Sequence, residues 1–123
     1  MGLLFLIGLL AAIETMVIIT VALMGGKWLK EYVAKKLKNK KNQKVAFADT
    51  REVVDDYLKN KADASDELSM EELERMCEKT PYVSALVDEN GEIGEYEGIY
   101  AEGCNENFEV RIKQQKGMIV VGV

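Results

Sequence analysis

The nucleophilic side chains of this sequence lack the partners that most enzyme sites need. The 123 residues include no histidine, which excludes Ser-His-Asp and Cys-His catalysis and metal sites built on imidazole. The two cysteines, Cys77 and Cys104, form no CxxC pair, and we predict reduced thiols because a disulfide would imply an oxidising compartment. Glu102 and Glu106 flank Cys104, and their charge would raise the pKa of its thiol. We predict a protein that is not an enzyme and uses no cofactor.

Carboxylates are abundant, and one acidic segment resembles the calcium-binding loop of an EF-hand in its spacing. Asp63, Ser65 and Glu72 fall at ligand-like positions within residues 61–72. Lys61 stands where the first carboxylate ligand belongs, and a positive charge there opposes a divalent cation. We therefore predict a polar loop over residues 60–66 and no metal site.

Charge divides the chain into three blocks, which we interpret as its domains. Residues 1–26 contain a single charged side chain, that of Glu14. Residues 27–44 contain eight lysines and one glutamate, whereas residues 45–123 contain nineteen acidic and eight basic residues. An acidic domain repels nucleic acid, so we predict no nucleic-acid partner.

Residues 2–24 form an apolar run that is interrupted only by Glu14, Thr15 and Thr20. A helix that spans a bilayer needs about 20 predominantly apolar residues. The lysines that follow favour a cytoplasmic position for the C-terminal side. We therefore predict a single transmembrane helix within residues 1–26, located in the cell membrane, with the N-terminus outside and the remaining residues in the cytoplasm.

Small residues gather on one side of this predicted membrane helix. Gly8 and Ala12 have the small-xxx-small spacing that allows two helices to approach closely. A carboxyl group at mid-bilayer usually faces protein or water. The alternative is a simple anchor with a protonated carboxyl group. The interpretation as an intramembrane packing site, in a homo-oligomer or against a partner helix, assigns five residues to it: Gly8, Ala11, Ala12, Glu14 and Thr15.

The basic block, residues 27–44, has the pattern of an amphipathic helix at a membrane surface. Tryptophan and tyrosine favour the headgroup level, and each lysine near an anionic leaflet contributes about 1 kcal/mol of attraction. We predict that this juxtamembrane segment contacts anionic lipid of the inner leaflet and frays over residues 38–44. An ordinary stop-transfer flank is the simpler alternative. The predicted interface residues are Trp28, Tyr32, Lys35, Lys36, Lys38, Lys40 and Lys41.

Residues 45–123 predict a small acidic α+β domain of two helices and about four antiparallel strands, with the helices on one face. Asp49 and Glu52 are spaced to cap one helix, and Ser69 and Glu72 form a capping box for a second. Strands are predicted over residues 82–87, 93–100, 108–113 and 118–121, with a hairpin turn at residues 88–91 that joins the first two.

Together these patterns predict a single-pass membrane protein whose small cytoplasmic domain binds a protein partner. Such a protein would be an accessory or assembly subunit of a larger membrane complex. The alternative is a self-assembling membrane component, holin-like or pore-forming, that acts through its transmembrane helix. The folded domain favours the first interpretation, and Glu14 beside small residues favours the second.

Overall fold

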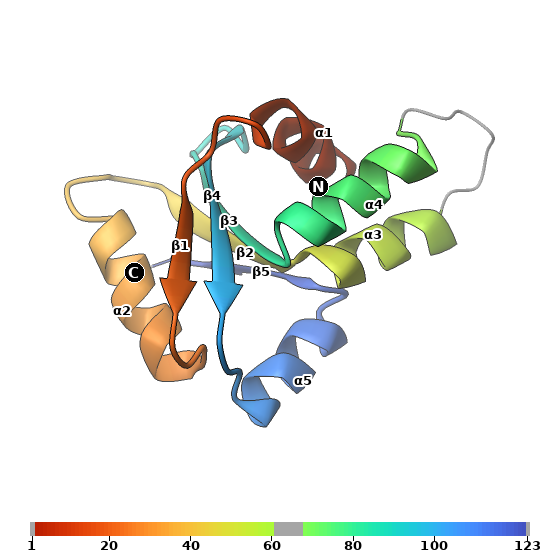
Figure 1. Cartoon of the computed structure of the whole chain (residues 1–123). Helices are drawn as coiled ribbons and strands as arrows, with labels where there is room; N and C mark the ends of the chain where they lie inside the picture. The colour runs from red at the N-terminus through yellow and green to blue at the C-terminus, as the bar shows by residue number, and fades with distance from the viewer. Residues whose placement is uncertain (1, 61–67, 123) are drawn as a thin grey trace.

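A five-stranded mixed sheet runs through the part of the chain that the computed structural model describes, residues 2–60 and 68–122 (Figure 1). The strand order is β1-β4-β3-β2-β5; β1 is parallel to β4, and the other neighbours are antiparallel. The predicted EF-hand-like segment falls mostly on residues 61–67, outside the described residues. The elements are α1 (Gly2–Ala12), β1 (Ile18–Val21), α2 (Gly26–Lys36), β2 (Lys44–Asp49), α3 (Thr50–Lys59), α4 (Met70–Lys79), β3 (Tyr82–Val87), β4 (Ile93–Ala101), α5 (Glu106–Gln114) and β5 (Met118–Val121).

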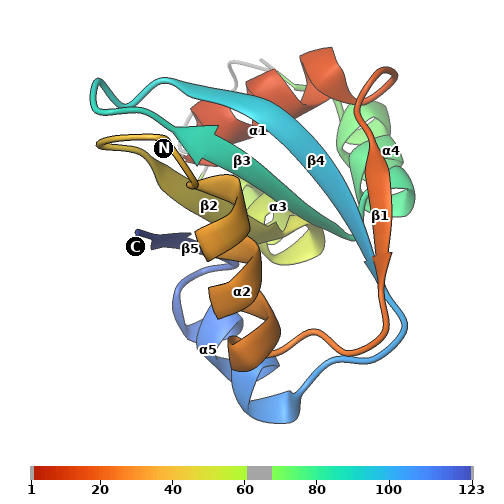
Figure 2. The same cartoon turned by 90° about the vertical axis from the view of Figure 1, so that its left-hand side faces the viewer.

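Helices cover both faces of the sheet. Helices α1, α3 and α4 lie on one face, and α2 and α5 lie on the other (Figure 2). Side chains that alternate along β2 serve both layers, because successive residues of a strand point to opposite faces. Ala46 and Ala48 belong to the first layer, and Val45 and Phe47 to the second. The prediction that helices cover one face only is therefore wrong.

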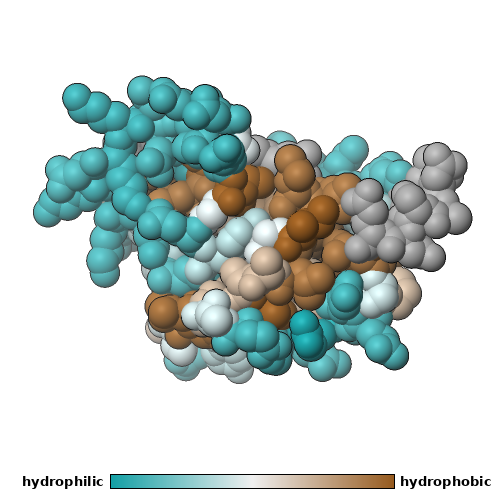
Figure 3. Space-filling view, turned by 90° about the horizontal axis from the view of Figure 1, so that it is seen from above, coloured by the Kyte–Doolittle hydropathy of each residue, from teal (hydrophilic) through white to brown (hydrophobic). Residues whose placement is uncertain are grey.

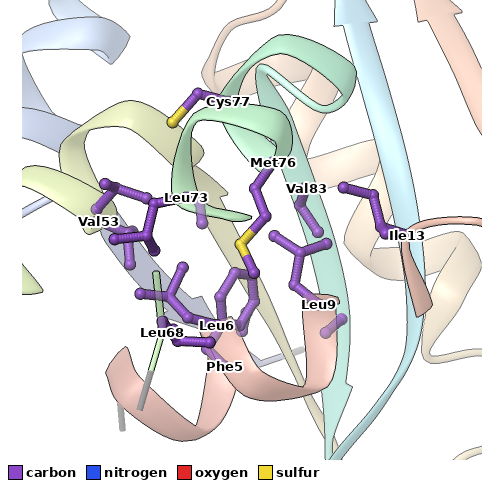
Figure 4. Close-up of a cluster of buried hydrophobic side chains, with 14 of the residues drawn as sticks. Phe5, Leu6, Leu9, Ile13, Val53, Leu68, Leu73, Met76, Cys77 and Val83 are labelled. Atoms are coloured by element: carbon purple, nitrogen blue, oxygen red, sulfur yellow. The ribbon is translucent and has the colours of Figure 1, made fainter. Parts of the chain in front are cut away.

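The first layer is a hydrophobic cluster. Phe5, Leu6 and Leu9 of α1 point toward Leu73 and Met76 of α4 (Figure 4), and all five are fully buried. Helix α4 is positioned by the predicted capping box, in which Ser69 Oγ accepts from the Glu72 amide and the Glu72 side chain accepts from the Ser69 amide. Asp49 likewise caps α3 by accepting from the Glu52 amide, as predicted.

The second layer is aromatic. The Phe47 ring lies at the centre of a group of rings, 5.8 Å from that of Trp28, 6.0 Å from that of Tyr82 and 5.7 Å from that of Phe108. Such offset or tilted pairs contribute about 0.5–1.5 kcal/mol beyond simple burial. These contacts join α2 and α5 to the centre of the sheet.

The predicted transmembrane helix is wrong. Among the described residues, no helix combines the length and the apolar character needed to cross a bilayer. The apolar run is divided between α1, which ends at Ala12, and the edge strand β1, and a turn at residues 13–15 separates them. The same finding contradicts the predictions of a single-pass protein, of a location in the cell membrane and of an N-terminus outside the cell.

Two physical reasons account for the break in the apolar run. Residues 17–21 are rich in β-branched side chains, which favour strands. Burial in the two layers also removes the apolar groups from water without a bilayer: Phe5, Leu9 and Ile13 enter the first layer, and Val21 and Met24 enter the second.

The C-terminal region follows the sequence prediction except at one element. The strands β3, β4 and β5 and the turn between β3 and β4 are confirmed. The predicted strand over residues 108–113 is wrong, because these residues belong to α5. The spacing of Phe108 and Ile112 fits a helix as well as a strand, because residues four apart lie on one face of either element. Val110, which only a strand would bury with them, is 52% exposed.

Candidate functional site

The small residues predicted for membrane packing lie on α1, and Gly8 makes a close approach there. A side chain at Gly8 would collide with the Tyr96 hydroxyl group of β4. That hydroxyl group donates a hydrogen bond of 2.8 Å to the Phe5 carbonyl oxygen, and the two rings are 5.4 Å apart. Gly8 therefore allows α1 to approach the sheet of its own chain. Ala11 is exposed and Ala12 is half-buried.

Glu14 and Thr15 lie in the turn after α1, and both are exposed. The Glu14 carboxylate pairs with Lys79 Nζ at 3.0 Å and with Arg75 Nη1 at 3.6 Å, both on α4. The hydrogen bond and the charge of Lys79 lower the pKa of Glu14. Thr15 Oγ1 donates to the Ala12 carbonyl oxygen at 3.3 Å. Glu14 thus joins α1 to α4 at the surface, as an ionised carboxylate.

Six of the seven residues predicted to contact lipid line one groove between α2 and β1, with a volume of about 730 Å³. We call it the basic groove. Lys36 Nζ pairs with Glu97 at 3.0 Å and Lys40 Nζ pairs with Glu95 at 2.9 Å, and both acids are on β4. The residues in question are Trp28, Tyr32, Lys35, Lys36, Lys38 and Lys40; Lys41, also exposed, does not line the groove.

A polar cluster lies at the base of the basic groove. The Tyr32 hydroxyl group donates to Glu97 Oε1 at 2.5 Å and lies 2.5 Å from Ser84 Oγ, which is placed to donate to it. Burial, followed by the hydrogen bond to Glu97, raises the pKa of Tyr32 well above its usual value. The phenol therefore stays protonated and acts as a hydrogen-bond donor. This cluster attaches α2 to β3 and β4.

Both cysteines are free thiols, one in each helical layer. Burial is the main cause that raises the pKa of Cys77 and of Cys104. For Cys104 the second cause is the charge of Glu109 on α5, and not that of the predicted Glu102 and Glu106. Thiols with a raised pKa are weak nucleophiles at neutral pH.

A second groove, of about 990 Å³, lies between α2, α5 and the edge strand β5. We call it the edge groove. Its walls include Leu29 and Val33 of α2 and Phe108 of α5, and its rim carries two cations, Lys30 and Arg111. Sequence reasoning missed this site entirely, because it placed α2 on a membrane and residues 108–113 in a strand.

The open edge of β5 is the chemically distinctive part of the edge groove. β5 stands last in the sheet order. The Asp49 amide donates to the Gly117 carbonyl oxygen at 2.8 Å, and an antiparallel ladder alternates along the strand. Ile119 and Val121 therefore bond to β2, and the backbone groups of Val120 point outward. Such unpaired amide and carbonyl groups form a template for another strand.

Within residues 2–60 and 68–122, no group of three or more potential ligands could hold a metal ion. Comparisons with family models, with curated proteins and with solved structures find no match to this chain.

Proposed function

We propose that this chain is a non-enzymatic interaction domain that binds an extended segment of a partner protein in the edge groove. The observation that carries the proposal is the open edge of β5 beside an apolar groove with a basic rim. An extended peptide can add as a strand to an exposed sheet edge, where main-chain hydrogen bonds give affinity and side-chain pockets give specificity.

The groove defines the chemistry of the bound segment. Alternate side chains of an added strand would point into the groove beside Ile119 and Val121, where apolar groups are favoured. An acidic side chain on the segment would meet Lys30 or Arg111, and no acidic residue lines the groove within the described part of the chain. The partner segment is therefore extended, with apolar residues at alternate positions and at least one aspartate or glutamate.

A selection from a displayed library of random 12-residue peptides tests the proposal with the full chain as bait. We expect enriched peptides with this pattern, and their affinity is then measured by fluorescence polarisation. Val120→Pro removes the outward amide without removing a bond to β2. It should weaken binding of an enriched peptide at least tenfold. Enriched peptides that bind Val120→Pro as tightly as the wild type would contradict the proposal.

Matched controls separate the edge groove from the rest of the surface. The Val17 carbonyl oxygen accepts from Gly98 of β4, and the Val21 carbonyl oxygen accepts from Glu102, which directly follows β4. Thr20 therefore directs its amide outward from the other edge strand, β1. Thr20→Pro should leave binding unchanged. The paired reversal Lys30→Glu with Arg111→Glu should weaken binding of acidic peptides, whereas Lys35→Glu, in the basic groove, should not. Equal loss in every variant would indicate non-specific adsorption.

A further inference from the structure

Helix α1 is apolar on all sides, but only one side enters the core. With about 100° of rotation per residue, Phe5, Leu6, Leu9 and Ile13 face the sheet, and Leu4, Ile7 and Ala11 occupy the opposite side. Leu4 is 64% exposed and Ile7 is 41% exposed. Seen from above, over α1, hydrophobic residues cover the centre of the molecule (Figure 3). We call Leu4, Ile7 and Ala11 the outer face of α1.

The outer face of α1 carries no charge. Residues 2–13 include no acidic or basic side chain, and the nearest one, Glu14, is paired with Lys79 and Arg75. Two copies of a chain with a net charge of −5 repel each other over most orientations. They can meet at this surface without placing like charges in contact.

The outer face is also complementary to itself in size. An isologous dimer brings the same surface of two copies together around a two-fold axis. If two α1 helices pack antiparallel, Leu4 of one copy lies against Ala11 of the other, so that a large side chain meets a small one twice. The two Ile7 side chains then meet close to the axis. We infer that the outer face of α1 is the contact surface of a homodimer with antiparallel α1 helices.

The size of the apolar surface suits this partner. Leu4 and Ile7, with Val17 and Ile18 after α1 at 65% and 53% exposure, together expose apolar surface on the order of a few hundred Å², the size of the largest patch on a typical monomer, which is often functional. Two such patches and their rims come close to the lower limit of roughly 1,000 Å² of total buried area for a biological interface. The dimer uses the α1 layer and leaves the edge groove, on the other face of the sheet, open.

Sedimentation velocity on the full chain over a range of concentrations tests the dimer. We expect a monomer–dimer equilibrium that Ile7→Glu shifts toward monomer by at least tenfold in the dissociation constant. Val110→Glu on α5 is the matched control, because Val110 is an exposed apolar residue of the other layer; it should leave the equilibrium unchanged. Both positions are exposed, so far-UV circular dichroism should show folded variants. A wild-type chain that stays monomeric throughout would overturn the inference.

A size swap distinguishes the antiparallel dimer from a merely adhesive patch. Ala11→Leu fills the position that receives Leu4, so it should weaken the dimer although it adds apolar surface. The double change Leu4→Ala with Ala11→Leu restores one large and one small residue at each contact and should recover association. A stronger dimer in the Ala11→Leu single variant, or no recovery in the double variant, would contradict the proposed packing.

Co-sedimentation with vesicles addresses the competing occupant of the same surface. We expect the wild-type chain to remain in solution with vesicles of phosphatidylcholine and phosphatidylserine, because the dimer covers the outer face of α1. Vesicle binding that Ile7→Glu abolishes, with a monomer in solution, would assign the face to lipid instead and reject the dimer.

Discussion

The two faces of the sheet are stabilised by different means. The α1, α3 and α4 layer is packed largely from aliphatic side chains, and its internal hydrogen bonds run from side-chain hydroxyl groups to backbone carbonyl oxygens, from Tyr96 to Phe5 and from Thr50 to Thr80. The α2 and α5 layer combines aromatic rings with the Tyr32, Ser84 and Glu97 cluster, and both grooves described above border it. Apolar burial stabilises the first layer, whereas a layer that contains a carboxylate cluster and borders two grooves is better suited to recognition.

The largest expected effect is loss of packing in the α1, α3 and α4 layer. Leu73 is fully buried between α1 and α3, and Leu73→Ala should reduce the free energy of unfolding by about 2–4 kcal/mol. Urea denaturation followed by circular dichroism measures this change. Met70→Ala, on the exposed side of the same helix, is the control and should stay within about 0.5 kcal/mol of the wild type. Equal effects at the two positions would remove the basis of the comparison.

A smaller loss is expected in the polar cluster of the other layer. Tyr32→Phe removes the hydroxyl group and leaves Ser84 and Glu97 without that partner, which should cost about 1–3 kcal/mol of unfolding free energy. Tyr100→Phe is the matched control, because Tyr100 is exposed. If Tyr32→Phe is as stable as the wild type, the cluster does not attach α2 to the sheet in the way described.

Alkaline pH should weaken both layers through their tyrosines. Burial raises the pKa of Tyr96 to about 12, and that of Tyr32 and Tyr82 also lies above the usual value of about 10. A raised pKa in the folded state means that the stabilisation is complete below the unfolded value and is lost as the pH rises through the folded value. Stability should therefore fall as the pH increases from about 10 to 12.

Tyr96→Phe provides the control for this alkaline transition. The variant lacks one of the raised pKa values, so its decline in urea midpoint above pH 10 should be shallower than that of the wild type. The variant also lacks the hydrogen bond to the Phe5 carbonyl oxygen. This loss lowers the urea midpoint by the same amount at every pH and does not itself change the slope. An identical slope would show that Tyr96 does not contribute to the pH dependence.

The smallest expected effect concerns the surface pair between α1 and α4. Glu14 has a lowered pKa because of Lys79, so its contribution is present above the unfolded pKa and is lost as the pH falls through the folded value. Glu14→Gln should lower the melting temperature slightly at pH 7, and the difference should shrink as the pH falls through the lowered pKa of Glu14. Exposed ion pairs contribute little, so a large effect at pH 7 would indicate that Glu14 does more than pair with α4.

Local signals in the sequence identified several elements correctly. The capping residues Asp49 and Ser69 and the β3–β4 hairpin depend on neighbouring residues, and the structure contains all of them. β2 was not predicted, because residues 44–49 are a short apolar run beside a lysine-rich segment. The edge groove could not be predicted from local pattern either, since it needs α2, α5 and β5 together.

The sequence by itself determined the composition of the apolar N-terminal run, the basic character of residues 27–44 and the caps of two helices. Only the tertiary structure decided where the apolar side chains go. Hydrophobic transfer is non-directional, so the apolar pattern of residues 2–24 is compatible with a bilayer and with a protein core. The sheet, with its alternate side chains available on both faces, provides that core: it buries α1 on one face and the end of β1 on the other.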